Sequence, residues 1–346
     1  MRQKFDDWRG SRGWKEVLKI IVKKRSVPNQ LLRLEAFIRR SSHTPDKVVA
    51  DYTKRKLGYQ GECSIDFYLS MLPPNQVSIM HDLRLHSERN GYFQLDTLLL
   101  TPQGLIILEI KNYQGTLYFD EYSHQVTRVL NEKEERIANP LLQVSRQRSH
   151  LHSHLISHGL PSLPIHTFVV FSSPLTILRS RSSQQTLSPK IIHAEAIPTQ
   201  VESYVQKGKQ KYLTLKQIQE IATLLNNNHQ PDLSNNLTSF NLNKVIKKGV
   251  HCPQCNQIAM HREPRIQNWK CAHCNNISKV AHIFTLQDYA LLFQPTITNL
   301  QAQDFLQISN ENMIKYLMRK LKLKTTGQNK GRKYHIPIPF EAKNYD

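Results

Sequence analysis

The 346-residue chain lacks any run of about 20 apolar residues, the length that a helix needs to cross a bilayer, so it predicts no transmembrane segment. Its first residues are charged from Arg2 onward and no apolar stretch follows, so no signal peptide is predicted. Without an export signal, we expect a cytoplasmic protein whose five cysteines stay reduced and available as metal ligands. Apolar residues make up 39% of the chain, a low share that indicates polar linkers or tails.

Acidic residues are also scarce, with 27 Asp and Glu against 47 Lys and Arg, which gives a net charge of +20. Residues 1–56 hold 16 basic and 6 acidic residues, and residues 312–340 hold eight basic residues and no acid. A chain this basic usually binds a polyanion, so DNA is the expected partner, with RNA as an alternative. An anionic membrane surface, bound by residues 14–25, and a merely solubilising surface are further alternatives. A homo-oligomer is compatible with the sequence, but nothing supports one.

The length predicts two or three domains. Runs of periodic apolar residues predict helices at 51–72 and 140–158 and strands at 77–80, 94–100, 105–111 and 165–171, with a hairpin near 116–130. The expected organisation is a basic helical segment (1–50), an α/β domain (51–224), an Asn-rich linker (225–247), a Cys-paired segment (248–284) and a basic helical tail (286–340).

A hairpin from Gln94 to Lys111 carries acids at the end of two apolar strands. If Pro102 and Gln103 form its turn, Asp96 lies opposite Glu109. Directly paired residues of an antiparallel ladder point to the same face, as do residues two apart on one strand. Asp96, Glu109 and Lys111 are therefore expected to meet on one face, and a register shift of one residue would separate them.

Two facing carboxylates repel each other and cost free energy to bury, so a cation between them is favourable. Carboxylates together with phosphate oxygens form a typical Mg²⁺ site, which predicts Asp96 and Glu109 as ligands of Mg²⁺ or Mn²⁺. Lys111 beside them is suited to orient an attacking water or to stabilise charge on a phosphate. The plain structural alternative is a pair of acids at a sheet edge that bind nearby basic residues.

Short motifs follow one another along this region: Gly61-Glu62, Gln94-Leu95-Asp96, Gly104, Glu109-Ile110-Lys111-Asn112 with Gly115, and Asn139-Pro140-Leu141-Leu142-Gln143. In this order they resemble the NERD (nuclease-related) domain of the PD-(D/E)xK restriction-endonuclease-like superfamily, over roughly residues 55–172. The resemblance implies a mixed β-sheet flanked by helices and Mg²⁺-dependent cleavage of nucleic acid. It also implies catalytic positions at Glu62, which would reach the metal through water, and at Gln143, which would orient a phosphate or a metal-bound water.

The two pairs Cys252/Cys255 and Cys271/Cys274 are CxxC motifs separated by 15 residues. This spacing is typical of a four-Cys zinc ribbon, so the four cysteines are predicted to bind a structural Zn²⁺. The segment has too few apolar residues for a core of its own, so metal binding should supply its folding energy.

The basic tail is expected to form a helix at 296–308 and a second helix at 310–321 with Ser309 as its N-cap. A basic turn and a strand-like run follow, a pattern that resembles a winged helix-turn-helix. A small protein-binding module is the alternative. The residues expected to contact DNA lie on the second helix (Asn312, Lys315, Tyr316, Arg319) and on the wing (Lys330, Arg332, Lys333).

Two functions remain open at this point. One is a Mg²⁺-dependent nuclease that its zinc ribbon and winged helix tether to DNA. The other is a non-catalytic DNA-binding protein that uses the nuclease-like fold as a scaffold, because fold-level resemblance does not establish activity.

Overall fold

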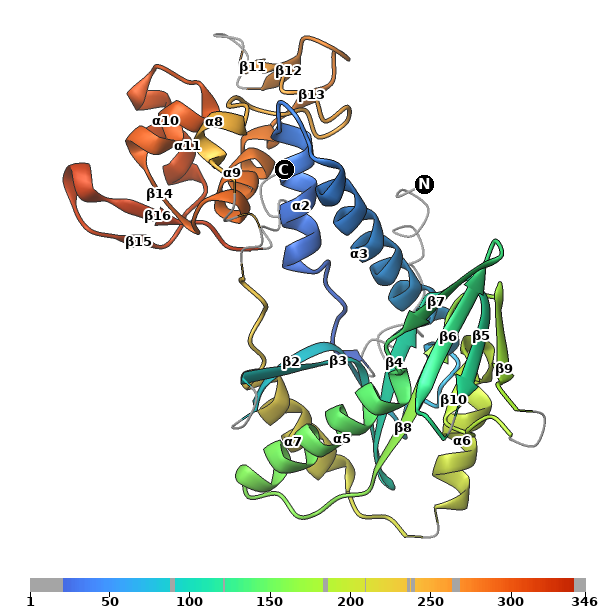
Figure 1. The fold of residues 1–346 in the computed structure, drawn as a ribbon. Coiled ribbons are helices and arrows are strands. Elements are labelled where there is room, and N and C mark those ends of the chain that lie inside the picture. Colours follow the sequence, from blue (N-terminus) through green and yellow to red (C-terminus); the bar gives the residue numbers. More distant parts are fainter. Residues whose placement is uncertain are drawn as a thin grey trace. The chain divides into compact units, whose positions relative to one another are not determined.

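The computed structural model describes residues 21–87, 91–120, 122–182, 186–208, 210–234, 237, 240–262 and 268–338 (Figure 1). It divides into two compact units: unit 1 comprises the described residues of Met1–Ser26 and Leu57–Pro231, and unit 2 those of Val27–Lys56 and Asp232–Asp346. The basic segment expected at 1–50 is thus divided between the units, and residues 1–20 lie outside the described residues. The finer division into five segments stays a prediction.

Unit 1 is built on a six-stranded mixed sheet with the strand order β1-β2-β3-β4-β8-β10. The β2–β3 and β3–β4 pairs are antiparallel, while the β1–β2, β4–β8 and β8–β10 pairs are parallel. The strands are β1 (Ile21–Lys23), β2 (Ser78–Ser87), β3 (Gly91–Thr101), β4 (Gly104–Lys111), β8 (Ile165–Phe171) and β10 (Ile191–His193). The mixed sheet flanked by helices confirms the predicted fold class, whereas β1 lies where a helical segment was expected.

Helices cover both faces of this sheet (Figure 1). Leu105 and Ile107 of β4 pack in one apolar cluster with residues of α5 (Pro140–Ser157) and α7 (Leu215–Asn227). The alternate residues Ile106 and Leu108 pack in a second cluster with α4 (Asp66–Leu69) and α6 (Ile197–Lys207). Burial on both faces explains why β4 is a nearly continuous apolar run.

A second sheet of unit 1 has the order β7-β6-β5-β9 and confirms the hairpin expected near 116–130. Its strands are β5 (Gly115–Asp120), β6 (Gln125–Leu130), β7 (Lys133–Ile137) and β9 (Thr176–Ser180). A short 3₁₀ helix, η1 (Ala194–Ala196), leads into α6.

The β3–β4 hairpin has the predicted turn and register. Its pairs run from Thr101↔Gly104 to Thr97↔Leu108, and the ladder ends one position before Asp96. Gly104 has a φ of +137°, and a Cβ there would lie 2.4 Å from the carbonyl oxygen of Pro164, so the turn requires glycine.

A break in strand alternation separates the two halves of the β2–β3 pair. The ladder includes His81↔Thr97 and Leu83↔Leu95 but skips the position between them, where Asp82 has a φ of +50°. Beyond the break, Leu83 and Leu95 pack on the sheet face that α5 covers. If side chains alternated strictly from Thr97 onward, both would lie on the opposite face, which α4 and α6 cover. A non-glycine residue in the left-handed region is strained, and such positions cluster at functional sites. Asp96 lies at this break.

Unit 2 has one main apolar core, to which most of its helices contribute. A buried acid joins two of its helices: Asp288 on α9 binds Arg40 at 2.7 Å and Arg39 at 2.6 Å on α2. The elements before the tail are α2 (Asn29–Arg40), the first part of α3 (Asp46–Ser64), α8 (Leu242–Val245), β11 (Met260–Arg262), β12 (Trp269–Cys271), β13 (Ile277–Ser278) and α9 (Ala281–Leu292).

The tail differs from expectation at both helix starts. The predicted helix 296–308 begins only at Asn299, because Thr298 caps it in a capping box with Gln301 and the β-branched residues before it form a strand. The second helix is capped by Asn310, whose Oδ1 accepts from the Met313 N–H at 3.1 Å, so the expectation of Ser309 was wrong. The elements are β14 (Thr296–Thr298), α10 (Asn299–Leu306), α11 (Glu311–Lys320), β15 (Thr325–Thr326), η2 (Asn329–Gly331) and β16 (Lys333–His335).

The three short strands of the tail form an antiparallel sheet in the order β14-β16-β15 beside the two helices. This arrangement is compatible with a winged helix, whose assignment stays a prediction. In the part of the chain that the structure describes, no helix has the length and apolar character needed to cross a membrane.

Candidate active site

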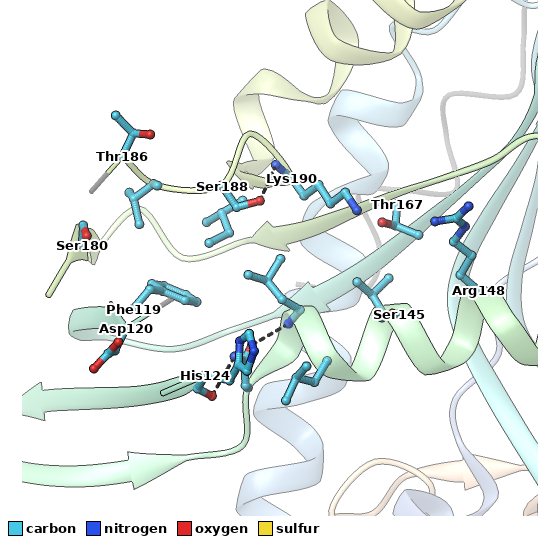
Figure 2. Close-up of a pocket in the computed structure, with 16 residues that line it drawn as sticks. Phe119, Asp120, His124, Ser145, Arg148, Thr167, Ser180, Thr186, Ser188 and Lys190 are labelled. Carbon is cyan, nitrogen blue, oxygen red and sulfur yellow. Dashed lines mark hydrogen bonds between the residues drawn. The ribbon is translucent and has the colours of Figure 1, made fainter. Parts of the chain in front are cut away.

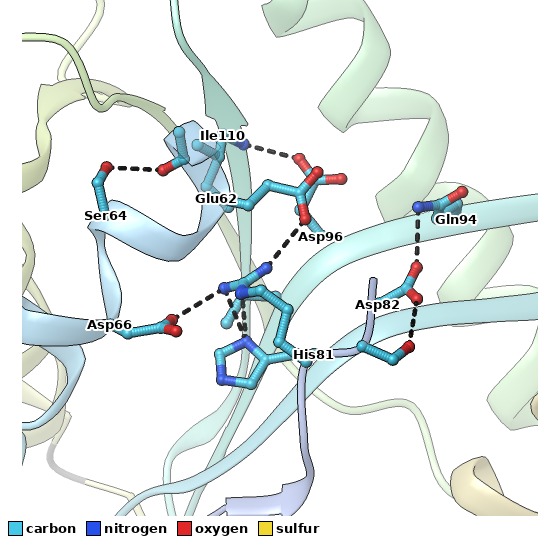
Figure 3. A network of polar contacts seen from close by, with 12 residues as sticks. Glu62, Ser64, Asp66, His81, Asp82, Gln94, Asp96 and Ile110 are labelled. Atoms are coloured by element: carbon cyan, nitrogen blue, oxygen red, sulfur yellow. Dashed lines mark hydrogen bonds and ion pairs between the residues drawn. The ribbon is translucent and has the colours of Figure 1, made fainter. Parts of the chain in front are cut away.

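The candidate site of unit 1 lies where β3 and β4 part beyond their last pair, and Figure 3 shows Glu62 and Asp96 pointing toward one another there. Asp96 comes from β3, Glu62 from the last turn of α3, and Gln143 from the first turn of α5. Together with Glu109 and Lys111 of β4, these are the five residues that the sequence predicted. They come from four elements that the sheet brings to one place.

Three donors hold the Glu109 carboxylate, whose residue is 2% exposed. Lys111 Nζ donates to Oε1 at 2.7 Å, Gln143 Nε2 donates to Oε1 at 2.6 Å, and Gln147 Nε2 donates to Oε2 at 2.6 Å. Gln143 also accepts from Lys111 Nζ at 2.9 Å. Charge-assisted hydrogen bonds of this kind fix the carboxylate in one orientation.

The first turn of α5 is fixed in the same region. Asn139 caps the helix, since its Oδ1 accepts from the Leu141 N–H at 2.9 Å, and Pro140 occupies the first turn as expected. Gln143 and Gln147 lie four residues apart and so share one face of the helix. The cap therefore sets the direction in which both amides reach Glu109.

Asp96 fills the gap where the two strands part. Its Oδ2 accepts from the backbone N–H of Ile110 at 2.9 Å, beyond the last residue pair of the ladder. The side chain thus satisfies a backbone donor that the neighbouring strand has left. This bond directs the Asp96 carboxylate toward β4.

Arg25 binds Glu62 on the other side of the site. Its Nη1 donates to Glu62 Oε2 at 3.0 Å, and its Nη2 donates to Asp66 Oδ1 at 3.1 Å and to Thr97 Oγ1 at 3.3 Å. Nη2 also lies 3.0 Å from His81 Nδ1, which must accept because a guanidinium only donates. The Arg25 side chain is 5% exposed.

A glycine allows α3 to approach the sheet. A Cβ at Gly61 would lie 2.4 Å from Cβ of Asn112 and 2.8 Å from Oγ of Ser172. Asn112 directly follows β4, and its Nδ2 donates to the carbonyl of Leu57 at 2.8 Å. The missing side chain of Gly61 therefore places the next residue, Glu62, at the site.

Two acids of the site, Asp96 and Glu62, are hard to ionise. Burial raises the pKa of Asp96 well above its usual value, the Glu109 and Glu62 carboxylates raise it further, and the Ile110 N–H acts against them. Burial also raises the pKa of Glu62 to about 7, although Arg25 favours its charged form. Clustered carboxylates with such shifts indicate negative charge that a bound cation would stabilise.

The bases of the site are affected in opposite directions. Burial acts to lower the pKa of Lys111, but the Glu109 carboxylate outweighs it and the pKa is raised. Burial, Arg25 and Lys23 together lower the pKa of His81 to about 3, so this imidazole is neutral. Lys111 is thus a charged donor and His81 a neutral acceptor near pH 7.

Sequence reasoning missed Gln147, Arg25 and His81. Gln147 was recognisable as the residue one turn after Gln143. The other two carried no signal, because Arg25 lies 37 residues before its partner Glu62 and His81 is hidden in an apolar strand.

The described cavities lie elsewhere on unit 1. The cavity in Figure 2 has a volume of about 410 Å³ and is lined by Arg148 and Lys190 together with apolar side chains from α5 and β10. A second cavity of about 740 Å³ shares Ser145 and Arg148 with it. Neither is lined by any of the five predicted site residues, so the candidate site rests on its carboxylates and not on a deep pocket.

The four cysteines of unit 2 form a cluster that could bind zinc. Their sulfurs lie within 4.8 Å of one another, with 3.6 Å between Cys252 and Cys274 and 3.7 Å between Cys255 and Cys271. A tetrahedral site with Zn–S bonds of about 2.3 Å requires S···S distances of about 3.8 Å, so the cluster fits this ion.

The described residues of the Cys-paired segment (248–284) form no separate core, as expected. Trp269 and Met260 are buried in the core that the cysteines share with α9, α10 and α11. Trp269 Nε1 donates to Nδ1 of His282 on α9 at 3.1 Å. Metal binding by the four cysteines would therefore be coupled to the core of unit 2.

The residues expected to contact DNA lie largely on the surface of the tail. On α11, Lys315 and Arg319 are exposed, Tyr316 is half-buried, and Lys315 binds Glu311 at 2.6 Å. Of the other residues expected to contact DNA, Asn312, Arg332 and Lys333 are exposed, and the side chain of Lys330 lies outside the described residues.

Comparison with known proteins agrees with the carboxylate site. Residues 57–172, about a third of the chain, match the family model of the nuclease-related domain (NERD). Over 98 residues the chain is 26% identical to an uncharacterized protein of Bacillus anthracis, which covers 28% of this chain and 46% of that relative. The match therefore spans about half the length of the relative. No solved structure matches the chain.

Proposed function

We propose that unit 1 is a divalent-metal-dependent nuclease that hydrolyses phosphodiester bonds in DNA. The observation that carries the proposal is the cluster of Asp96, Glu109 and Lys111 at the end of a hairpin whose register is fixed from Thr97↔Leu108 onward. The NERD match over these residues supports it.

Asp96 and Glu109 are the residues that would hold Mg²⁺ or Mn²⁺. Their carboxylates are the oxygen ligands that these ions prefer. Burial and the neighbouring Glu109 and Glu62 carboxylates raise the pKa of Asp96, and a bound cation would favour its charged form. Gln147 donates to Glu109 through its Nε2. Its Oε1 is buried and has no hydrogen-bond partner among the described residues. When bound, the ion would neutralise charge on the phosphate and make a bound water more acidic.

Lys111 is placed to act on the attacking water or on the phosphate. Its side chain is 19% exposed, and two of its three N–H donors bind Glu109 and Gln143. Among the described residues, the third donor has no partner and remains for a substrate group. Gln143 contacts both Lys111 and Glu109 and therefore fixes their separation.

The direct test is cleavage of plasmid DNA, linear DNA and RNA with Mg²⁺ or Mn²⁺, compared with excess chelator. Glu109→Gln and Lys111→Met should each lower the metal-dependent rate by at least about 100-fold, the scale of removing one charged group from a transition state. Equal inactivity of the wild type and both variants on all three substrates would overturn the nuclease proposal.

A second candidate is a DNA-binding protein without turnover. It is favoured by the 2.7 Å Lys111–Glu109 pair and the 3.0 Å Arg25–Glu62 pair, which supply counterions to two of the carboxylates from the chain itself. The same cleavage assay separates the two candidates, because this one predicts DNA binding without any metal-dependent product.

Unit 2 is proposed to hold the protein on DNA through its zinc segment and its basic tail. Cations that contact phosphates release counterions, so raising the salt concentration should weaken binding steeply. Arg319→Ala should lower the slope of log affinity against log salt by about one. Lys216→Ala is the matched control, since Lys216 lies on α7 of unit 1, is 87% exposed and should leave the slope unchanged.

A further inference from the structure

The guanidinium of Arg25 is a cation built into the candidate site. Its side chain is 5% exposed, and its Nη atoms bind Glu62, Asp66 and Thr97. Its Nε is buried and finds no hydrogen-bond partner in the described part of the chain. A group enclosed in this way does not contact a nucleic-acid phosphate, so any influence of Arg25 on the reaction must pass through the side chains that it binds.

A short strand and a lysine hold Arg25 in place. Ile21 and Lys23 of β1 pair with β2 in parallel. Lys23 Nζ donates to the carbonyl oxygens of His81 and Asp82, each at 2.9 Å. These contacts anchor the backbone two residues before Arg25, beside the break in β2, and so fix where its side chain enters the site.

The pair with Arg25 thus occupies one oxygen of the Glu62 carboxylate. Among the described residues, the four cysteines are the only group of three or more His, Cys, Asp or Glu side chains whose ligand atoms come close enough to hold a metal ion. Glu62, Asp96 and Glu109 do not form such a group, and Glu62 Oε2 is paired with Arg25 at 3.0 Å. A guanidinium and a divalent cation are attracted to the same carboxylate and repel each other.

We propose that Arg25 competes with a divalent cation for the Glu62 carboxylate, so that Asp96 and Glu109 are the only metal-binding carboxylates while Arg25 is in place. Arg25 is a positioning residue in this scheme. The inference rests on the proposed metal-dependent function, but it adds a residue that lies outside the 57–172 match.

The test is calorimetric titration of the full chain with Mn²⁺ at pH 8, where Glu62 is ionised. The guanidinium carries one positive charge and Mn²⁺ carries two. At a separation of about 6 Å, their repulsion lowers the Mn²⁺ affinity by about tenfold even when water screens it fully. Arg25→Gln should therefore bind Mn²⁺ at least about tenfold more tightly than the wild type. Arg25→Lys keeps the positive charge that repels the ion and should stay within about threefold of the wild type.

Two further variants separate this effect from a general loss of charge or structure. Lys24→Gln removes the same charge from the exposed neighbouring residue and should leave the Mn²⁺ affinity unchanged. In the double variant Arg25→Gln/Glu62→Gln, the affinity should return to within about threefold of the wild type, because the competed carboxylate is gone. Circular dichroism spectra should be the same for all variants.

The outcomes are distinct. Unchanged or weaker Mn²⁺ binding by Arg25→Gln, or a gain that persists in the double variant, overturns the role of Arg25 and leaves the metal site standing. If the wild type binds no more Mn²⁺ at this site than an Asp96→Asn variant does, both the proposed function and this inference fail.

Discussion

Replacing Gly61 by alanine tests how the close approach of α3 positions the site. The added Cβ would lie 2.4 Å from Asn112 Cβ and 2.8 Å from Ser172 Oγ. Carbon atoms in contact lie about 3.5–4.0 Å apart, so α3 must move away from the end of β4 by about 1 Å. Overpacking of this kind costs about 1–3 kcal/mol, and the better helix propensity of alanine offsets about 1 kcal/mol of that.

The same shift moves the neighbouring Glu62 and its ion pair with Arg25. A misplacement of about 1 Å in a catalytic arrangement lowers the rate by up to about 100-fold. We therefore expect Gly61→Ala to be destabilised by up to about 2 kcal/mol in urea unfolding and to lose at least about tenfold in metal-dependent cleavage.

Gly58 provides the matched control on the same helix. It is exposed, and a Cβ there meets no atom within 4 Å. Gly58→Ala should stabilise the protein by about 0.5–1 kcal/mol and keep the cleavage rate. If Gly61→Ala behaves like Gly58→Ala in both assays, the packing argument for the position of Glu62 is refuted.

Three other predictions follow from contacts in the two units. Gln147→Leu removes one donor from the buried Glu109 and should cost about 1.5–3 kcal/mol in urea unfolding, which an unchanged midpoint would contradict. The raised pKa of Glu62 stabilises the folded state below pH 4.5, and this contribution is lost as the pH rises through about 7. Between pH 4.5 and about 7, the free energy of unfolding of the wild type should thus fall by about 2–3 kcal/mol relative to that of Glu62→Gln. Parallel stability curves for the two proteins would disprove this contribution of Glu62. Zinc chelation should shift Trp269 fluorescence, because that ring is buried in the core that contains the cysteines; an unshifted spectrum after metal removal would disagree.

Local patterns in the sequence predicted the turn and register of the hairpin that carries the candidate site. Turn chemistry at Pro102-Gln103 and the two-residue period of a strand set the register from Thr101↔Gly104 to Thr97↔Leu108, and Asp96 and Glu109 directly follow its last pair. The cap of α5 is equally local, since Asn139 and Pro140 adjoin in the sequence. CxxC spacing predicted the cysteine cluster for the same reason.

Contacts between distant segments were not predictable. Arg25 reaches Glu62 through a strand of three residues that pairs with β2, and no periodic pattern marks so short an element. The left-handed backbone at Asp82, which changes the face of β2, follows from the fold around it. In the tail, Thr298 caps a helix because the residues before it pair with β16, a partner that lies over 30 residues away.

The central claim is that Asp96 and Glu109 share one divalent ion. The most direct measurement is anomalous diffraction from crystals of the protein soaked in Mn²⁺. We expect a peak within about 2.5 Å of carboxylate oxygens of both Asp96 and Glu109, with Glu62 still bound to Arg25. A structure in which Mn²⁺ occupies other sites but leaves these two carboxylates without an ion would contradict the account.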